Sequence, residues 1–225
     1  MKRASFGVVV ALLFTAGNAR AEAGWLTARG RLLPETVVEA FVGTRSFGAG
    51  FVRTDTGNPR AGLSFEGVVG FTDRDAELRG ARVWQLGDTR FATASVSLGG
   101  AAFLVPDRAF DLGLGPQAQL ALSLGGKVFS VDLALQTGLE LFLRQQGPPR
   151  LPQRAVLGLH LRLSEFTLAV MARAGADVFP GRSFVGRGEV MVSVGWLGLD
   201  TSLSRERPEA PPTPAPTPAP IKAGG

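Results

Sequence analysis

One stretch of strict alternation between apolar and polar side chains limits what this chain can fold into. In residues 128–143 the two kinds of side chain fall on opposite parities. The apolar set is Phe129, Val131, Leu133, Leu135, Leu139, Leu141 and Leu143, and the polar set is Ser130, Asp132, Gln136 and Glu140. A period of two indicates a β-strand with one apolar face. The stretch is tall enough to cross a bilayer, whereas strands of soluble proteins average about 5–6 residues. We therefore predict one strand of a transmembrane β-barrel.

The N-terminus carries the pattern of an export signal. Lys2 and Arg3 precede an apolar run at residues 6–16, and residues 19–21 read Ala-Arg-Ala, a small-x-small cleavage pattern. We predict a signal peptide over residues 1–21, cut before Glu22. No later segment offers the roughly 18 consecutive apolar residues of a transmembrane helix. An exported chain of this kind enters a membrane as a closed barrel.

Composition argues against several classes of function. The chain has no cysteine, so disulfides, thiolate metal sites and nucleophilic thiols are not expected. Loss of the signal peptide removes three basic residues and lowers the formal charge from +5 to about +2. The arginines form no run, so nucleic-acid binding is not expected. Tyrosine is absent, so aromatic girdles must be built from Phe and Trp.

The same alternation recurs along the chain between turn signals. Ten segments carry it, at residues 36–45, 47–53, 63–71, 76–86, 90–104, 110–124, 128–143, 155–163, 166–174 and 184–196. The number falls to eight if the weaker segments are extensions, and residues 197–204 either extend the last strand or fold back. Bacterial barrels have even strand numbers, with tight periplasmic turns and longer outer loops. We place residues 125–126 and 164–165 among the periplasmic turns. The outer hairpins are then expected at residues 45–47, 72–75, 105–109, 144–153 and 176–183.

These features together resemble the small outer-membrane β-barrel proteins of Gram-negative bacteria. The resemblance is carried by the signal peptide and by the alternating repeats from residue 36 to residue 204. It implies an all-β fold, an antiparallel up-and-down barrel over residues 22–207, in contact with outer-membrane lipid and assembled by the barrel assembly machinery. The chain departs from many such proteins because it does not end on an aromatic-terminated strand and is not acidic.

Residues 208–225 form a separate proline-rich segment. Alternating prolines, among them Pro211, Pro214, Pro216 and Pro218, favour an extended polyproline arm. At about 3.1 Å per residue the arm would reach some 40 Å into the periplasm. It is either a docking tether for a periplasmic partner or the cell wall, or a solvated tail.

A set of polar side chains is predicted to face the barrel interior. Its members are Glu66, Asp132, Glu140, His160, Arg162, Arg173 and Glu189. We expect these charges to pair and fill the lumen, with Asp132 and Glu140 as partners of Arg162 and Arg173. A pore lining is the alternative. His160, the single histidine, is expected to be a hydrogen-bonded filler, and without a second His or any Cys no metal, cofactor or catalytic site is predicted.

Three functions remain compatible with this sequence. The first is a non-enzymatic barrel that anchors or scaffolds a multiprotein envelope complex for secretion, surface adhesion or gliding motility. The second is a narrow porin-like channel for small solutes. The third is a lipid-active enzyme, which the missing Ser and His arrangement disfavours. The small outer-face residues Ala92, Ala94 and Ala118 are expected to contact lipid, with close docking against another membrane protein as the alternative.

Overall fold

The computed structural model describes residues 24–71, 75–105, 111–143, 149–178 and 185–198. The predicted signal peptide, the proline-rich segment with Pro211, Pro214, Pro216 and Pro218, and nearly all of residues 197–204 lie outside the described residues. No helix among the described residues is long and apolar enough to cross a membrane.

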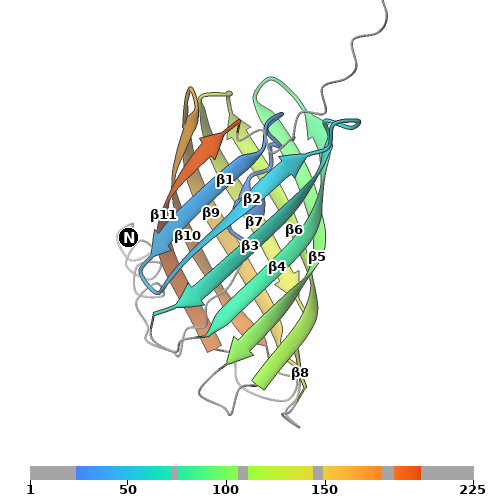
Figure 1. Cartoon of the computed structure of the whole chain (residues 1–225), viewed down its shortest axis with the longest axis vertical. Helices are drawn as coiled ribbons and strands as arrows, with labels where there is room; N and C mark the ends of the chain where they lie inside the picture. The colour runs from blue at the N-terminus through green and yellow to red at the C-terminus, as the bar shows by residue number, and fades with distance from the viewer. Residues whose placement is uncertain (1–23, 72–74, 106–110, 144–148, 179–184, 199–225) are drawn as a thin grey trace, which may run out of the picture.

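The described strands form a single antiparallel sheet that closes on itself (Figure 1). The strands are β1 (Val37–Gly43), β2 (Ser46–Thr54), β3 (Ala61–Gly70), β4 (Ala76–Asp88), β5 (Ala92–Val105), β6 (Asp111–Gly125), β7 (Phe129–Gly138), β8 (Leu141–Phe142), β9 (Leu151–Leu163), β10 (Phe166–Val178) and β11 (Val185–Leu197). Neighbours along the chain pair with each other, except that β8 pairs with β6 and β7 pairs with β9, and β1 pairs with β11 to close the barrel. The predicted all-β up-and-down barrel is confirmed.

Strands β7 and β8 together make one strand of the wall. Both pair with β6, and the chain between them is held by the Leu139 amide, which donates to the Pro116 carbonyl at 3.0 Å. Asp132 and Glu140 stay buried on opposite sides of this interruption, so the alternation of faces continues through it. The described wall therefore has ten strands, as predicted, and residues 128–143 form one of them with a break near Leu139.

The two ends of the barrel differ in their connections. Residues 55–60, 89–91, 126–128 and 164–165 turn the chain at one end, which also holds the start of β1 and the end of β11. We call this the turn end and the opposite one the loop end. Positive φ angles at Gly125 (126°) and Ser164 (50°) mark the two predicted tight turns. Strands β1, β3, β5, β8 and β10 all end at the loop end, as the strand count predicts, and residues 72–74, 106–110, 144–148 and 179–184 of the predicted outer hairpins lie outside the described residues.

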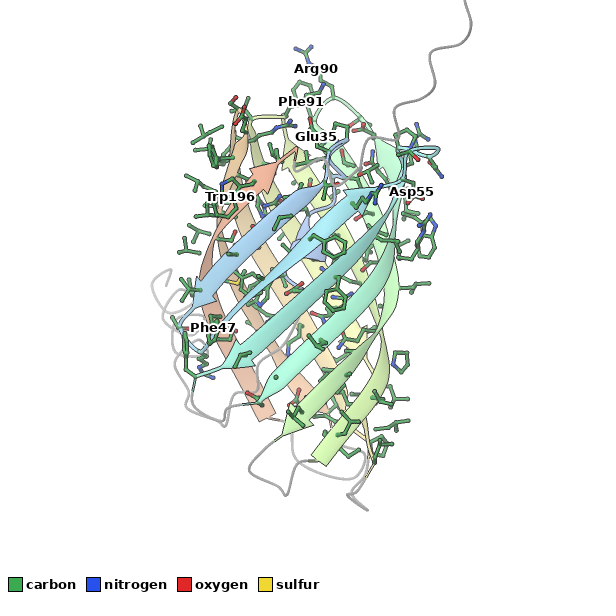
Figure 2. All side chains as sticks on the ribbon, in the orientation of Figure 1. Glu35, Phe47, Asp55, Arg90, Phe91 and Trp196 are labelled. Atoms are coloured by element: carbon green, nitrogen blue, oxygen red, sulfur yellow. The ribbon has the colours of Figure 1, made fainter. Side chains whose placement is uncertain are left out.

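The outer surface of the wall is apolar. Large aliphatic side chains stand exposed on every side of it, among them Leu98, Leu120, Leu135, Leu157 and Val192. A soluble protein does not leave a belt of this size in water, whereas lipid-facing walls require it. Aromatic pairs border the belt: Phe47 stacks on Phe71 at 5.5 Å, and Phe166 meets Trp196 edge-on at 6.2 Å (Figure 2).

Candidate functional site

The lumen contains a segment of the chain itself. Residues 24–35 lie inside the barrel before β1 begins, and they include a short 3-10 helix, η1 (Leu26–Ala28), which contacts β2, β3, β6, β7 and β9. We call residues 24–35 the plug segment. The Trp25 side chain within it is 0% exposed. Inward side chains of the surrounding wall are small, as at Ala121, Ala134 and Ala169, so the lumen has room for the plug segment.

Glu66 of β3 holds the inner tip of the plug segment. Its carboxylate accepts hydrogen bonds from the backbone amides of Gly24 at 3.0 Å, Trp25 at 3.2 Å and Leu26 at 3.3 Å. The Trp25 and Leu26 amides lie at the start of η1, where a helix leaves amides without partners and a negative charge is favourable. The Arg173 guanidinium lies 4.1 Å from the Trp25 ring centroid, a cation–π contact. The inner tip is therefore held by hydrogen bonds to the Glu66 carboxylate and by the contact between Arg173 and the Trp25 ring.

Towards the turn end, the plug segment is bonded to the wall at successive residues. The Arg31 amide donates to Ser123 Oγ at 3.1 Å, and the Leu32 amide donates to Gln85 Oε1 at 3.3 Å. Between these contacts and η1 the backbone comes very close to the wall at Gly30, where a Cβ would lie 2.5 Å from the Ser123 amide nitrogen. Only glycine permits this approach.

Arg29 and Glu39 connect the plug segment to the seam of the barrel. Arg29 Nη2 donates to both carboxylate oxygens of Glu39 on β1, at 3.0 and 2.9 Å. The same carboxylate accepts a hydrogen bond from Ser193 Oγ on β11. Glu39 thus joins the first strand, the last strand and the plug segment.

The structure places the predicted interior set inside the lumen, with a different pairing. Glu66, Asp132, Glu140, His160, Arg173 and Glu189 are buried, and Arg162 is half-buried near the turn end. Asp132 contacts His160 of β9, and Glu140 contacts Arg150. Arg162 pairs with Glu35 of the plug segment at 3.1 Å, and Arg173 faces Glu189 at 3.4 Å. The predicted pairing of Asp132 with Arg162 or Arg173 is wrong, because the register of β7 against β9 places Asp132 opposite Gly158 and leaves His160, two residues further along β9, as its diagonal partner.

A second charged layer fills the lumen near the loop end. Asp177 of β10 accepts from Arg150 at 3.0 Å and also from Arg154, and all three side chains are buried. Deeper in the lumen, Arg79 donates to Gln119 at 3.0 Å and to Ser97 at 3.2 Å. In the loop-end half of the barrel, charged side chains fill the lumen, as expected. In the other half the plug segment supplies much of the filling.

Sequence reasoning gave no structure to the plug segment. Residues 24–35 show neither a period of two nor a helical period, and η1 is only three residues long. Two signals were available: Trp25 and Leu26 are adjacent apolar residues in a stretch without alternation, and the inward positions of the predicted strands hold many small side chains. The lumen of a ten-stranded barrel with small inward side chains is not filled by those side chains alone, so another segment of the chain is needed to fill it.

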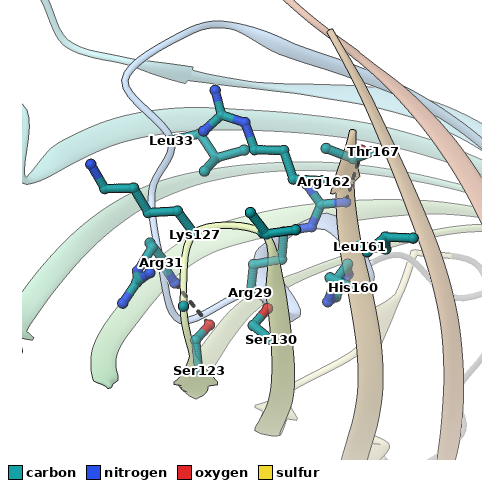
Figure 3. Close-up of a pocket in the computed structure, with 12 residues that line it drawn as sticks. Arg29, Arg31, Leu33, Ser123, Lys127, Ser130, His160, Leu161, Arg162 and Thr167 are labelled. Atoms are coloured by element: carbon teal, nitrogen blue, oxygen red, sulfur yellow. Dashed lines mark hydrogen bonds between the residues drawn. The ribbon is translucent and has the colours of Figure 1, made fainter. Parts of the chain in front are cut away.

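A basic mouth lies at the turn end. An inner cavity of about 40 Å³, drawn in Figure 3, shares part of its lining with an outer vestibule of about 1190 Å³. Arg31, Lys127 and Arg162 line both spaces, while Arg29 and His160 line only the inner cavity. No carboxylate lines the inner cavity.

The lumen does not assemble a hydrolytic triad from the described residues. The His160 ring presents Nδ1 to Asp132, but Ser123 and Ser130 also bond to Asp132, and His160 Nε2 has no described partner. A serine nucleophile would have to contact Nε2. Nor do the described residues contain a group of three or more His, Asp or Glu side chains that could hold a metal ion.

No protein-family model and no characterised relative matches the sequence. Among solved structures, the chain is similar to the outer membrane channel DcaP of Acinetobacter baumannii, at 10% identity and a TM-score of 0.37. The match covers 74% of this chain and 60% of the channel, so the chain spans about 60% of that protein's length. Identification therefore rests on the closed wall and its apolar belt. The chain is an outer-membrane-type β-barrel.

The contact between Glu66 and the plug segment gives this barrel a testable weak point. Glu66→Gln keeps the side-chain size but removes the charge that three backbone amides share. Docking of the plug segment should weaken by about 1.5–3 kcal/mol, the usual worth of a hydrogen bond to a charged group. The measurement is acrylamide quenching of Trp25 with Trp84 and Trp196 changed to Phe. Quenching should rise for Glu66→Gln and stay unchanged for Glu165→Gln in the exposed turn at residues 164–165, and equal responses would contradict the assignment.

Proposed function

We propose that this protein is a non-enzymatic integral outer-membrane barrel that anchors or scaffolds a multiprotein envelope complex, with its turn end facing the periplasm. The observation that carries the proposal is the plug segment, whose Trp25 is fully buried inside the lumen. A barrel that binds part of its own chain in its lumen, by hydrogen bonds at both ends of that segment, is built to remain closed. Its surface, rather than its lumen, is then what it offers to partners.

The orientation follows from the connections. Outer-membrane barrels keep tight turns and chain ends on the periplasmic side. The turn end has both the start of β1 and the end of β11, so a segment that continues from residue 198 would emerge there. This arrangement supports the role of residues 208–225 as a periplasmic tether.

A narrow porin-like channel is the second candidate, and the basic mouth favours it. Arginine and lysine side chains around a vestibule raise the local concentration of anions and line anion-selective pores. For this function the plug segment would have to leave its hydrogen bonds to Glu66 and Ser123 during conduction.

Two measurements on the full chain separate these candidates. In planar bilayers the scaffold should show no steady conductance, because the plug segment and the loop-end charges occupy the lumen. In native membranes, crosslinking should capture a discrete envelope partner that is lost when residues 208–225 are deleted. A stable open conductance of the unmodified protein, or crosslinking that yields no tail-dependent partner, would contradict the scaffold.

A further inference from the structure

We propose that the inner cavity of the basic mouth is a binding site for a single phosphate group, which enters from the turn end. The site would be formed by Arg29 of the plug segment, Lys127 of the turn after β6, and His160 and Arg162 of β9 (Figure 3). It goes beyond scaffolding and conduction, because either kind of barrel could carry it.

Two residues that line the cavity each have a buried nitrogen atom without a partner among the described residues. One is Arg29 Nε. The Arg29 guanidinium is bonded through Nη2, which donates to Glu39 and, over a longer distance, to Thr167. The other is Nε2 of His160, a side chain that is 8% exposed. Buried polar groups without partners are rare and costly, so two of them on residues that line one cavity point to a ligand beside them.

The two nitrogen atoms require opposite partners. Arg29 Nε–H can only donate. The Nδ1 atom of His160 faces the carboxylate of Asp132, which favours a proton on Nδ1 and leaves Nε2 of the neutral ring as an acceptor. A hydrogen phosphate offers oxygens that accept from Arg29 and a hydroxyl that donates to His160. A carboxylate offers acceptors alone, so the donor and acceptor pattern favours phosphate.

The charges of the lining favour an anion. Arg29, Arg31 and Arg162 each have a carboxylate partner, at 2.9, 3.7 and 3.1 Å. None of these carboxylates lines the cavity, although Asp88 and Glu35 line the vestibule. The ion pairs therefore hold three guanidinium groups beside the cavity. Lys127 has no carboxylate partner among the described residues and lines both the cavity and the vestibule. Its ammonium group is free to reach a ligand at the entrance.

The volume sets the size of the ligand. A water molecule needs about 10–15 Å³, so a cavity of about 40 Å³ holds one group of phosphate size and not a sugar or a nucleotide. The rest of a phosphorylated molecule would lie in the vestibule, beside Arg60, Arg90 and Phe91. Free phosphate and the headgroup of a phosphorylated lipid both supply such a phosphate group.

The single histidine makes the proposal directly testable. The full chain, folded in a maltoside detergent and labelled with ¹⁵N-histidine, is titrated with inorganic phosphate at constant ionic strength. The Nε2 resonance of His160 should shift and saturate. In the same titration by calorimetry, Lys127→Gln should weaken phosphate binding about tenfold, the effect of losing one charge-assisted hydrogen bond. Arg90→Gln, which changes a cation of the vestibule only, should change the affinity less than twofold.

Comparison ligands separate the outcomes. Tighter binding of dihexanoyl phosphatidic acid than of inorganic phosphate assigns the site to a lipid headgroup, and equal or weaker binding assigns it to a soluble phosphate; either supports the proposal. An equal response to acetate would overturn the choice of phosphate. No saturable His160 shift with either phosphate ligand, or equal losses for Lys127→Gln and Arg90→Gln, would overturn the site itself.

Discussion

A chain that lacks residues 24–35 is expected to conduct ions in a planar bilayer, with a steady conductance at least about tenfold above that of the full chain. The reason is the size of the wall: ten strands enclose more space than their own side chains fill when many of those side chains are as small as Ala121, Ala134 and Ala169. Water would replace the plug segment along the polar side of the lumen. A heat-dependent shift in gel mobility checks that the shortened chain still forms a barrel.

A single substitution tests the same conclusion without shortening the chain. Gly30→Val places a side chain where the nearest wall atoms would be 2.5 and 2.6 Å from its Cβ. Overpacking of this kind costs about 1–3 kcal/mol, which would raise the undocked population of the plug segment about 5–150-fold. Gly57→Val is the matched control, because a Cβ there meets nothing within 4 Å. Conductance and acrylamide quenching of Trp25 should increase for Gly30→Val only, and equal quenching for the two variants would contradict the docked position of the plug segment. A shortened chain that stays closed would assign the closure to the charged layer near the loop end.

Asp177→Ala is expected to be the most destabilising single substitution in the wall, with a loss of about 3–5 kcal/mol in the free energy of unfolding. Asp177 is fully buried and accepts from two buried arginines, Arg150 and Arg154. Its removal takes away the carboxylate that lies between two guanidinium groups in a medium where charge is poorly screened. Urea unfolding in lipid vesicles, followed by gel mobility, measures the loss.

Asp55 provides the matched control for that measurement. It also pairs with an arginine, Arg82, but both side chains are about one-third exposed. Exposed ion pairs contribute about 0–1 kcal/mol, so Asp55→Ala should have a small effect. Equal losses for the two substitutions would mean that the buried layer near the loop end contributes no more than a surface pair.

The wall could be predicted from the sequence because its rule is local. Successive residues of a strand face opposite sides, so the position of Leu135 outside and of Asp132 inside follows from parity alone. The pairing inside the lumen could not be predicted in the same way. Which inward side chains meet depends on the register of one strand against the next, and the register of β7 and β9 makes His160, not Arg162, the diagonal neighbour of Asp132.

The plug segment and the basic mouth were beyond sequence reasoning for a different reason. Residues 24–35 are shaped by the wall around them, through Glu66 of β3 and Ser123 of β6, and have no period of their own. The phosphate site then combines this segment with a turn and with β9. Only Lys127 beside the tight turn and the single His160 hinted at it, and neither residue is informative alone.

The Glu39 contact has a consequence for how the barrel assembles. Glu39 accepts from Arg29 of the plug segment and from Ser193 of β11, which is 154 residues later in the chain. The inner segment and the final strand thus converge on one carboxylate of the first strand. Docking of the plug segment in the lumen and pairing of β11 with β1 are therefore coupled steps. The docked plug segment stabilises the closed pair of β1 and β11, and that closed pair in turn stabilises the docked plug segment.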